Sequence, residues 1–328
     1  MIEPFNLTTT FAKKALKLFT YQRNHNPVYQ RFCEALGVRE VASVEDIPLL
    51  PISAFKDTVV KTQHSKLNSQ DSALYFQSSG TSGMVRSRHY LADMGIYRQS
   101  IIKGMQHFYY LDDYAILAYT PGYQANQHSS LVWMLNVLIE RDESELSRFL
   151  ELNQPLDQKL VDEIAKSGKK VMLFGAAFGL LDMLEMGKIK VPEDTVIIET
   201  GGMKTYRREM SKEELHQKLA KGFGLSIMQI HSEYGMTELM SQAYSQGSVW
   251  FKPVPWMKVS IRDPQNPMNN LPAGEEGLIG TIDLANVYSC AFILTGDKGV
   301  QNEEGEFQVL GRWNPVNLRG CNFLIDDD

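Results

Sequence analysis

The sequence predicts an α/β protein in which mostly parallel sheets are flanked by helices and a smaller β-rich part follows. Between residues 114 and 230, short apolar segments alternate with helical patterns, the order of elements that builds a parallel sheet covered by helices. After residue 247, apolar or alternating stretches lie between turns that contain proline and glycine, and no helical pattern separates them. A length of 328 residues is ample for two domains, which we expect at residues 1–247 and 248–328.

The first predicted element is a helical stretch over residues 11–37. Phe11, Ala15 and Leu18 recur near a spacing of three and four residues, and Gly37 offers a place for the helix to end. A polar loop follows over residues 63–72. We therefore expect the N-terminal helical stretch to be a packing layer rather than a site.

The alternating part of the chain begins with an apolar strand. In this part of the chain, Ser211 and Glu214 mark the start of one helix. They lie three residues apart, as in a capping box, where each side chain bonds a backbone amide that has no partner within the helix. In chain order, we predict a strand over 114–119, helices over 129–139 and 156–166, a strand over 171–174, a helix ending at Met186, a strand over 196–198, a helix after Ser211 and a strand over 226–230. In the β-rich part, strands are predicted within 250–261 and 277–284.

Composition excludes several classes of protein. The 33 Lys and Arg residues against 39 Asp and Glu give a formal net charge of -6, which does not favour nucleic acid as a partner. Cys33, Cys290 and Cys321 lie far apart, which fits neither a disulfide framework nor a zinc site and is typical of a reducing cytoplasm. The N-terminus lacks a secretory apolar core, and the apolar runs fall short of the about 20 residues that a membrane span needs. We expect a cytoplasmic protein without a membrane span.

The first chemical signal is the loop Ser78-Ser79-Gly80-Thr81-Ser82-Gly83. Its glycines let backbone amides approach an anion and its hydroxyls add donors, as a phosphate-binding loop requires. It is not a Walker A loop, because Gly83 is followed by Met84-Val85-Arg86 instead of Lys-Ser/Thr. Taken alone, the loop also fits a flexible surface turn.

Four further polar segments stand out, two of them just past predicted strands and two in the β-rich part. In a parallel sheet, ligands bind beyond the carboxyl ends of the strands, so segments that follow separate strands can converge on one pocket. The segments are Glu199-Thr200-Gly201-Gly202, His231-Ser232-Glu233-Tyr234-Gly235-Met236-Thr237-Glu238, Leu294-Thr295-Gly296-Asp297 and Gly311-Arg312.

Together, these motifs resemble those of the adenylate-forming superfamily of acyl-CoA synthetases, adenylation domains and luciferases, over residues 75–320. The resemblance implies an adenylate-forming N-terminal-domain-like fold whose β-rich part is a small distorted β-barrel. It also implies that the protein uses ATP and Mg²⁺. In this family, a loop like Ser78 to Gly83 holds the ATP phosphates, with Arg86 standing here where lysine is usual, and a turn like Gly201-Gly202 lies against adenine.

The acidic motifs have implied roles as well. The segment Tyr234 to Glu238 resembles the Tyr-Gly-x-Thr-Glu motif, in which Thr237 would contact phosphate and Glu238 would hold magnesium. A carboxylate is a natural ligand for this hard cation. Asp297 of the Thr-Gly-Asp motif would accept from both ribose hydroxyls, and Arg312 resembles the second ribose contact. An isolated acid at either position would more often be a surface or turn residue, but the motifs occur together.

The chain departs from the superfamily after Arg312. Family members continue into a mobile lid whose lysine bridges the substrate carboxylate and the α-phosphate, whereas this sequence ends at Asp328, so we expect neither lid nor lid lysine. Lys204 and Arg86 are candidate cations in its place, although Lys204 alone fits a solvated surface residue. The LuxE-type acyl-protein synthetase branch is similar in ending soon after a segment like Leu318-Arg319-Gly320-Cys321. This similarity implies that Cys321 would receive the acyl group. The alternative is that Cys321 is a small residue packed near a terminus.

Two histidines are candidate substrate contacts. His128 stands near the position where the family often has a histidine or aromatic residue beside the acyl group. His231 is either a substrate contact or a satisfied core histidine at a strand end. Apolar stretches such as 131–139 and 174–181 either line an acyl tunnel or form plain core.

We interpret the chain as an ATP-dependent acyl-protein synthetase that converts a carboxylic acid into an acyl-adenylate and passes the acyl group to a protein thiol. The resemblance favours a fatty acid, with aryl acids second, and an acyl-accepting partner protein such as a reductase or carrier. One alternative is an acyl- or aryl-CoA ligase whose lid comes from a partner. Another is a non-catalytic nucleotide- or acyl-binding subunit, against which the presence of both Glu238 and Asp297 argues.

Overall fold

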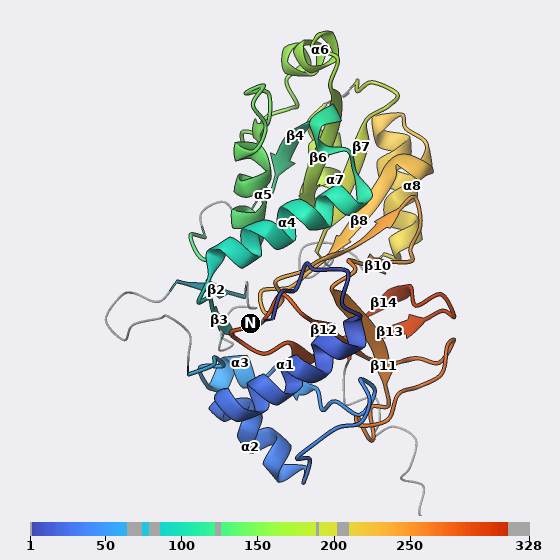
Figure 1. Cartoon of the computed structure of the whole chain (residues 1–328). Helices are drawn as coiled ribbons and strands as arrows, with labels where there is room; N and C mark the ends of the chain where they lie inside the picture. The colour runs from blue at the N-terminus through green and yellow to red at the C-terminus, as the bar shows by residue number, and fades with distance from the viewer. Residues whose placement is uncertain are drawn as a thin grey trace, which may run out of the picture.

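The computed structural model describes residues 2–63, 74–78, 86–121, 126–187, 190–201 and 210–313 (Figure 1). Its larger sheet has seven strands in the order β10-β9-β8-β7-β6-β4-β5, of which β5, β4, β6, β7 and β8 run parallel. The strands are β4 (Tyr114–Tyr119), β5 (Arg148–Phe149), β6 (Lys170–Ala176), β7 (Val196–Thr200), β8 (Ile230–Tyr234), β9 (Ala243–Gln246) and β10 (Lys252–Pro253). Strands β9 and β10 add antiparallel pairs at one edge. The predicted α/β class with a mostly parallel sheet is confirmed.

Helices cover both faces of this sheet, as the alternation of side chains along a strand requires. On β4, Ile116 and Ala118 belong to the core beneath α4 (Met94–Phe108) and α5 (Ser130–Glu140). Ala115 and Leu117 belong to the core on the other face. That face is covered by α6 (Gln158–Lys166), α7 (Ala177–Met186) and α8 (Lys212–Phe223). The strands are thus buried on both faces, which is why they read as continuous apolar runs.

The β-rich part forms a second sheet in the lower half of Figure 1. It contains β1 (Leu50–Pro51), β11 (Met257–Arg262), β12 (Gly277–Asp283), β13 (Phe292–Gln301) and β14 (Phe307–Arg312). The order is β1-β13-β12-β11, and β14 also pairs with β13. No pairing between the strands of residues 2–63 and 210–313 closes this sheet, so the small distorted barrel expected from the resemblance is an open sheet in the described part of the chain.

The N-terminal helices α1 (Phe11–His25), α2 (Pro27–Ala35) and α3 (Ala54–Asp57) pack with the second sheet. Gln22 Nε2 donates to the carbonyl oxygens of Asn286 at 2.7 Å and Val287 at 2.8 Å. Strand β1 pairs with β13 as well. The first 60 residues therefore join the β-rich part, and the domain boundary near residue 247 remains a prediction.

Three local features differ from the sequence-based expectation. The helix predicted over 11–37 is broken at Asn26, whose side chain caps α2 by accepting from Val28 N at 3.1 Å, with a proline at the first helical position. Helix α4 was not predicted. The strand predicted over 226–230 is the 3₁₀ turn η2 (Ile227–Gln229), capped by Ser226, and β8 begins only at Ile230.

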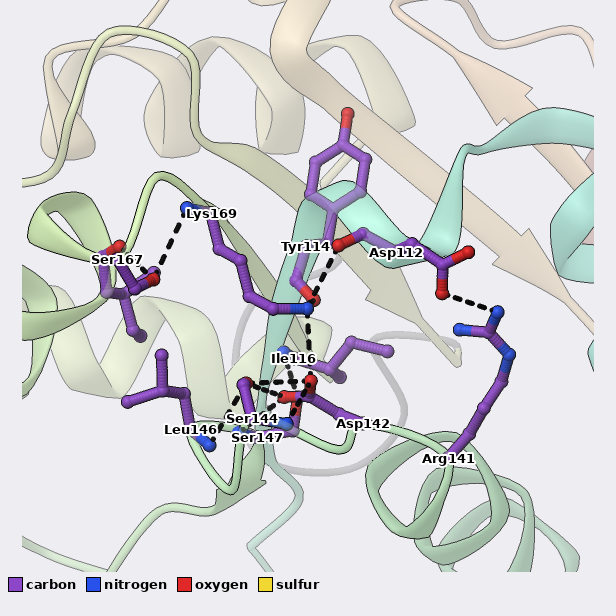
Figure 2. Close-up of polar contacts among 11 residues, drawn as sticks. Asp112, Tyr114, Ile116, Arg141, Asp142, Ser144, Leu146, Ser147, Ser167 and Lys169 are labelled. Carbon is purple, nitrogen blue, oxygen red and sulfur yellow. Dashed lines mark hydrogen bonds and ion pairs between the residues drawn. The ribbon is translucent and has the colours of Figure 1, made fainter.

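The amino ends of β4 and β6 are held by a buried carboxylate (Figure 2). Asp142, just after α5, accepts from Ser147 Oγ at 2.6 Å and Ser144 Oγ at 2.7 Å, and lies 3.0 Å from Lys169 Nζ. Lys169 Nζ also donates to the carbonyl oxygen of Asp112 at 2.9 Å. Burial opposes ionisation, but the two serines and Lys169 hold the pKa of Asp142 well below its ordinary value. The network is structural and lies at the end of the sheet opposite to the carboxyl ends of β7 and β8.

The remaining strands form a hairpin, β2 (Tyr75–Gln77) paired with β3 (Arg88–Tyr90), and a short 3₁₀ turn, η1 (Leu111–Asp113), precedes β4. No helix within the described ranges is long and apolar enough to cross a bilayer.

Candidate functional site

Hairpin β2–β3 carries the predicted phosphate-binding loop. At its base, Ser78 N donates to the carbonyl oxygen of Ser87 at 3.2 Å, and Ser87 N donates to Ser78 Oγ at 3.1 Å. Arg86 is exposed next to this base. The loop residues Ser79, Gly80, Thr81, Ser82 and Gly83 lie outside the described residues. The two serines thus fix the points at which the loop leaves and rejoins the hairpin.

Glu238 lies against this base. Its side chain is buried, and Ser87 Oγ donates a hydrogen bond to its Oε1. Burial raises the pKa of Glu238 above its ordinary value, while the Ser87 hydrogen bond and the charges of Arg312 and Lys56 oppose that shift. Glu238 is therefore a desolvated carboxyl group with cations in its surroundings, a state that a bound cation would favour in its ionised form.

The segment from Tyr234 to Glu238 begins where β8 ends. A Cβ on Gly235 would meet the carboxylate of Glu233 and approach Gln242 Cγ to 3.3 Å, so glycine leaves space for both side chains. Thr237 is partly buried in the turn that follows. The absence of a side chain at Gly235 leaves room for the Glu233 carboxylate at the start of the segment that leads to Glu238.

Asp297 and Arg312 face each other on neighbouring strands. They are register partners of β13 and β14, and Arg312 Nε lies 3.0 Å from Asp297 Oδ1. The other carboxylate oxygen, Oδ2, accepts from the hydroxyl of Tyr234 at 3.0 Å. Thr295 Oγ1 accepts from the amide of Asp297 at 3.1 Å. These contacts fix the Asp297 carboxylate between the two sheets.

The predicted Gly-Gly turn follows β7. Gly201 has φ +84°, in the left-handed region that favours glycine, whereas Gly202 and Lys204 lie outside the described residues. Beneath the turn, the buried Glu199 receives a hydrogen bond from Ser232 and lies 2.6 Å from Lys212 Nζ. Burial would raise its pKa, but Lys212 and its hydrogen-bond donors lower the pKa of Glu199 to about 2. Two residues before Gly201, the chain thus carries an ionised carboxylate that Lys212 of α8 holds in place.

These contacts join motifs that are far apart in the sequence. Ser78, Ser87 and Glu238 form one connected set, and Tyr234, Asp297 and Arg312 form another. Both sets meet in the segment from Tyr234 to Glu238. Strand β7 pairs with β8 directly beside this segment. The described parts of the predicted motifs therefore converge at the carboxyl ends of β7 and β8, where the two sheets approach each other.

The two candidate histidines lie elsewhere, beside the hairpin and on β8. His128 stacks on Tyr75 of β2 with ring centroids 4.2 Å apart, and its Nδ1 donates to the Tyr75 carbonyl oxygen at 3.1 Å. His231 is buried near the amino end of β8, where its Nδ1 accepts from the Tyr109 hydroxyl at 3.0 Å and its Nε2 donates to the Met228 carbonyl oxygen at 3.1 Å. Burial lowers the pKa of His231 to about 4. The structure thus places His231 apart from the converging motifs, as a satisfied core histidine.

Of the three cysteines, two are described. Cys33 and Cys290 are free and fully buried. Burial raises the pKa of Cys33 to about 11 and that of Cys290 further. Neither is suited to react as a thiolate. Cys321 lies outside the described residues.

Three residues at this site were missed in the sequence. Ser87 and His89 follow Arg86 directly after the predicted phosphate-binding loop, and this position in the sequence was the signal that could have marked them. The charge of Lys56, on α3, acts to lower the pKa of Glu238. Lys56 precedes the region of resemblance, so no motif marked it.

No three His, Cys, Asp or Glu side chains among the described residues gather into a metal site of their own. Glu238 is a single buried carboxyl group beside the base of the predicted phosphate-binding loop. This donor set fits a magnesium ion that takes most of its ligands from phosphate oxygens and water.

A protein-family model described as "Acyl-protein synthetase, LuxE" matches residues 6–328. The long-chain-fatty-acid–luciferin-component ligase of Vibrio harveyi is 27% identical over 342 residues, which cover 97% of this chain and 87% of that protein. The similarity therefore extends over the converging motifs and the residues beyond the described part.

Solved structures of low sequence identity share the fold. ATP-bound MatB from Rhodopseudomonas palustris superposes with a TM-score of 0.52 at 19% identity, over 73% of this chain and 47% of that one. An open conformation of 2-hydroxyisobutyryl-CoA ligase, in complex with 2-HIB-AMP and CoA, gives a TM-score of 0.63 at 15% identity, over 92% of this chain and 69% of that one. The chain thus spans about half the length of MatB and shares its adenylate-forming fold.

Proposed function

The chain belongs to the LuxE family of acyl-protein synthetases, and on that premise we propose that it uses ATP to convert a fatty acid into an acyl-adenylate and then transfers the acyl group to a protein thiol. The observation that carries the proposal is that two sets of contacting residues meet in the segment from Tyr234 to Glu238. The sets are Ser87 with Glu238, and Tyr234 with Asp297 and Arg312. All but Ser87 come from segments that the sequence alone assigned to one nucleotide site.

Asp297 and Arg312 are the proposed ribose contacts. The Asp297 carboxylate is already oriented by Tyr234 and Arg312, and each carboxylate oxygen has a second lone pair that can accept from a ribose hydroxyl. Because these bonds involve a charged acceptor, they are stronger than neutral ones. The preformed geometry supports nucleotide binding without rearrangement of either strand.

The phosphates would lie towards the loop that Ser78 and Ser87 close, with Thr237 as a further phosphate contact. Glu238 is the residue that would hold magnesium, which would supply charge neutralisation to the phosphates when bound. Gly201 and Gly202 would lie against adenine, over the carboxylate of Glu199 that Lys212 holds in place.

In the first half-reaction, an oxygen of the substrate carboxylate attacks the α-phosphorus, and the bond from that phosphorus to pyrophosphate breaks. Positive charge around the α-phosphate stabilises this step. Arg86 and Lys204 are the proposed cations. In the second half-reaction, a thiolate sulfur attacks the acyl carbonyl carbon and AMP leaves with the bonding electrons.

The nature of the acid rests on the relative from Vibrio harveyi, whose name specifies a long-chain fatty acid. His128, stacked on Tyr75 beside the phosphate-loop hairpin, is the proposed contact for the acyl group. Cys321 is the proposed first acceptor, and a partner protein the final one. Free thiols at Cys33 and Cys290 support a cytoplasmic location.

The experiment that tests this function is ATP–pyrophosphate exchange, with the purified protein and a panel of saturated fatty acids of increasing length, benzoate and no acid. We expect exchange that requires a fatty acid and magnesium, and radiolabelled acid bound to the protein through a bond labile to neutral hydroxylamine. Absence of exchange with every acid would contradict the proposal. Label that appears only as acyl-CoA when coenzyme A is added would instead identify a CoA ligase.

A further inference from the structure

Two buried side chains outside the predicted motifs hold the backbone of the Thr237–Glu238 pair. His89 Nδ1 donates to the carbonyl oxygen of Thr237 at 2.9 Å, and Asn286 Nδ2 donates to the carbonyl oxygen of Glu238 at 2.8 Å. His89 Nε2 and Asn286 Oδ1 lie 3.1 Å apart, so the two side chains also touch each other. Both are fully buried. Consecutive carbonyl groups are thus held by two neighbouring side chains, which we call the His89–Asn286 clamp.

The clamp is needed because no sheet ladder reaches this segment. Strand β8 ends at Tyr234, and β9 begins only at Ala243. A buried carbonyl group without a partner is costly, so a segment outside regular structure depends on side-chain donors. In this segment the donors come from His89 and Asn286, and they determine where the backbone that carries Glu238 lies.

The clamp itself is anchored on two independent elements. His89 lies on β3, two residues after Ser87, and the ring of Phe55 from α3 packs edge-on against it with centroids 5.7 Å apart. Asn286 lies in the turn between β12 and β13, where its carbonyl oxygen accepts from Gln22 of α1. The Glu238 segment is thereby tied to the phosphate-loop hairpin on one side and to the second sheet on the other.

The end of β12 holds the residues just after Glu238. Asp283, the last residue of that strand, accepts from the amide of Met240 at 2.8 Å and from Ser241 Oγ at 2.6 Å. Together with the bond from Asn286 to Glu238, these contacts hold the chain on both sides of Leu239. The second sheet therefore fixes the course of the backbone for several residues around the Glu238 carboxylate.

We propose that His89 and Asn286 are positioning residues, which hold Thr237 and Glu238 in the geometry that magnesium ATP requires. The inference rests on the proposed function, since it takes Thr237 and Glu238 as the phosphate and magnesium contacts. A displacement of a reacting group by about 1 Å can lower a rate by about 100-fold. Loss of the clamp therefore lowers turnover and magnesium-dependent ATP binding, although neither side chain touches the nucleotide.

The test compares His89→Leu and Asn286→Asp with wild type and with His89→Asn. His89→Leu removes both ring nitrogens at similar volume, and Asn286→Asp removes the donor to Glu238. In His89→Asn, the amide nitrogen stands near the position of Nδ1 and can still donate to Thr237. Asp142→Asn is the control for loss of stability, because Asp142 lies in a buried polar network at the opposite end of the sheet. Thermal unfolding identifies variants that still fold.

We expect His89→Leu and Asn286→Asp to lower kcat for fatty-acid-dependent pyrophosphate exchange by about tenfold or more, consistent with a misplaced reacting group. In calorimetry, these variants should lose the gain in ATP affinity that magnesium gives wild type, while retaining the affinity measured without magnesium. His89→Asn should recover part of kcat and part of the gain in ATP affinity that magnesium gives. Asp142→Asn should keep wild-type kinetics. If either clamp variant folds and keeps wild-type exchange and magnesium dependence, or if Asp142→Asn behaves like the clamp variants, the inference is wrong.

Failure of the proposed function has a different signature. Wild type that binds magnesium ATP but exchanges no pyrophosphate with any acid would overturn the function alone, and calorimetry would still decide on the clamp. Wild type that does not bind ATP would overturn both.

Discussion

The hydroxyl of Tyr234 donates to Oδ2 of Asp297 at 3.0 Å, and this hydrogen bond links the end of β8 in the larger sheet to β13 in the second sheet. Both residues are mostly buried. Burial and the neighbouring Asp297 charge raise the pKa of Tyr234 well above its ordinary value, so the phenol stays protonated and remains a donor. The bond fixes the orientation of the Asp297 carboxylate.

Replacement of Asp297 tests the ribose assignment. In Asp297→Asn, one charged acceptor is lost, and a hydrogen bond to a charged group contributes about 1.5–3 kcal/mol, which corresponds to about 10- to 100-fold in affinity. We expect calorimetry to show ATP affinity reduced within this range, and wild type to bind 2′-deoxy-ATP more weakly than ATP. Tyr234→Phe is the matched control, since it removes the anchor of Asp297 but keeps its charge, and should weaken binding less. Equal affinity of wild type for the two nucleotides would place the ribose elsewhere.

Glu238→Gln tests the magnesium assignment. The amide has nearly the same volume and can still accept from Ser87, so we expect little change in the unfolding temperature. Acid-dependent pyrophosphate exchange should fall by about 100-fold or more, because a charged ligand to the metal is lost in the transition state. A Ser87→Ala variant, which keeps the carboxylate, should retain more activity. Exchange in Glu238→Gln near the wild-type rate would contradict the assignment.

The parallel order of the larger sheet could be predicted because its strands are buried on both faces and read as apolar runs between helical patterns. Strand β4 was predicted with its observed bounds, 114–119. Helix α4 was missed because Gly95 and Gly104 interrupt its pattern. Gly104 has a packing reason that the sequence does not reveal, since a Cβ there would lie 3.3 Å from Val254 Cγ1. Such a close approach between distant segments is visible only in the folded chain.

The residues of the candidate site could likewise be predicted only in part. Tyr234 and Glu238 could be found because parallel strands bring their carboxyl ends to one edge. Asp297 was found from the Thr-Gly-Asp motif alone, since it lies within β13 of the second sheet. The partners of these residues could not be predicted, since Ser87 lies 151 residues from Glu238 and His89 lies 148 residues from Thr237. No spacing rule connects positions so far apart. Their contact follows from the way the hairpin and the second sheet enclose the segment after β8.

Glu233 makes stability depend on pH. Burial raises its pKa to about 7, with the charge of Glu199 adding to the shift and the hydrogen bond from Thr200 opposing it. The folded protein therefore keeps a proton that the unfolded chain, with an ordinary value near 4.5, releases. Between these two values the native state binds more protons, so the free energy of unfolding falls as the pH rises.

Glu233→Gln should remove this pH dependence, because glutamine has no proton to release and keeps an acceptor for Thr200. We expect urea unfolding to show the variant gaining stability relative to wild type between about pH 5 and about pH 7.5, the range over which wild type loses it. Arg98→Gln serves as the control, since it breaks an exposed ion pair with Glu140. If the stability difference between Glu233→Gln and wild type is the same at about pH 5 and about pH 7.5, Glu233 is ionised over this whole range.

Cys321 is the thiol that we expect to receive the acyl group. Cys33 and Cys290 are fully buried and burial raises the pKa of both, so neither supplies a thiolate at neutral pH. Cys321 is the remaining cysteine of the chain and the proposed acceptor. We expect wild type and the double variant Cys33→Ala, Cys290→Ala to acquire equal hydroxylamine-labile label from ATP, magnesium and radiolabelled fatty acid. Cys321→Ala should acquire none while keeping pyrophosphate exchange, because adenylate formation needs no thiol. If Cys321→Ala is labelled like wild type, the acceptor is another group, and loss of label only in the double variant would assign it to a buried cysteine.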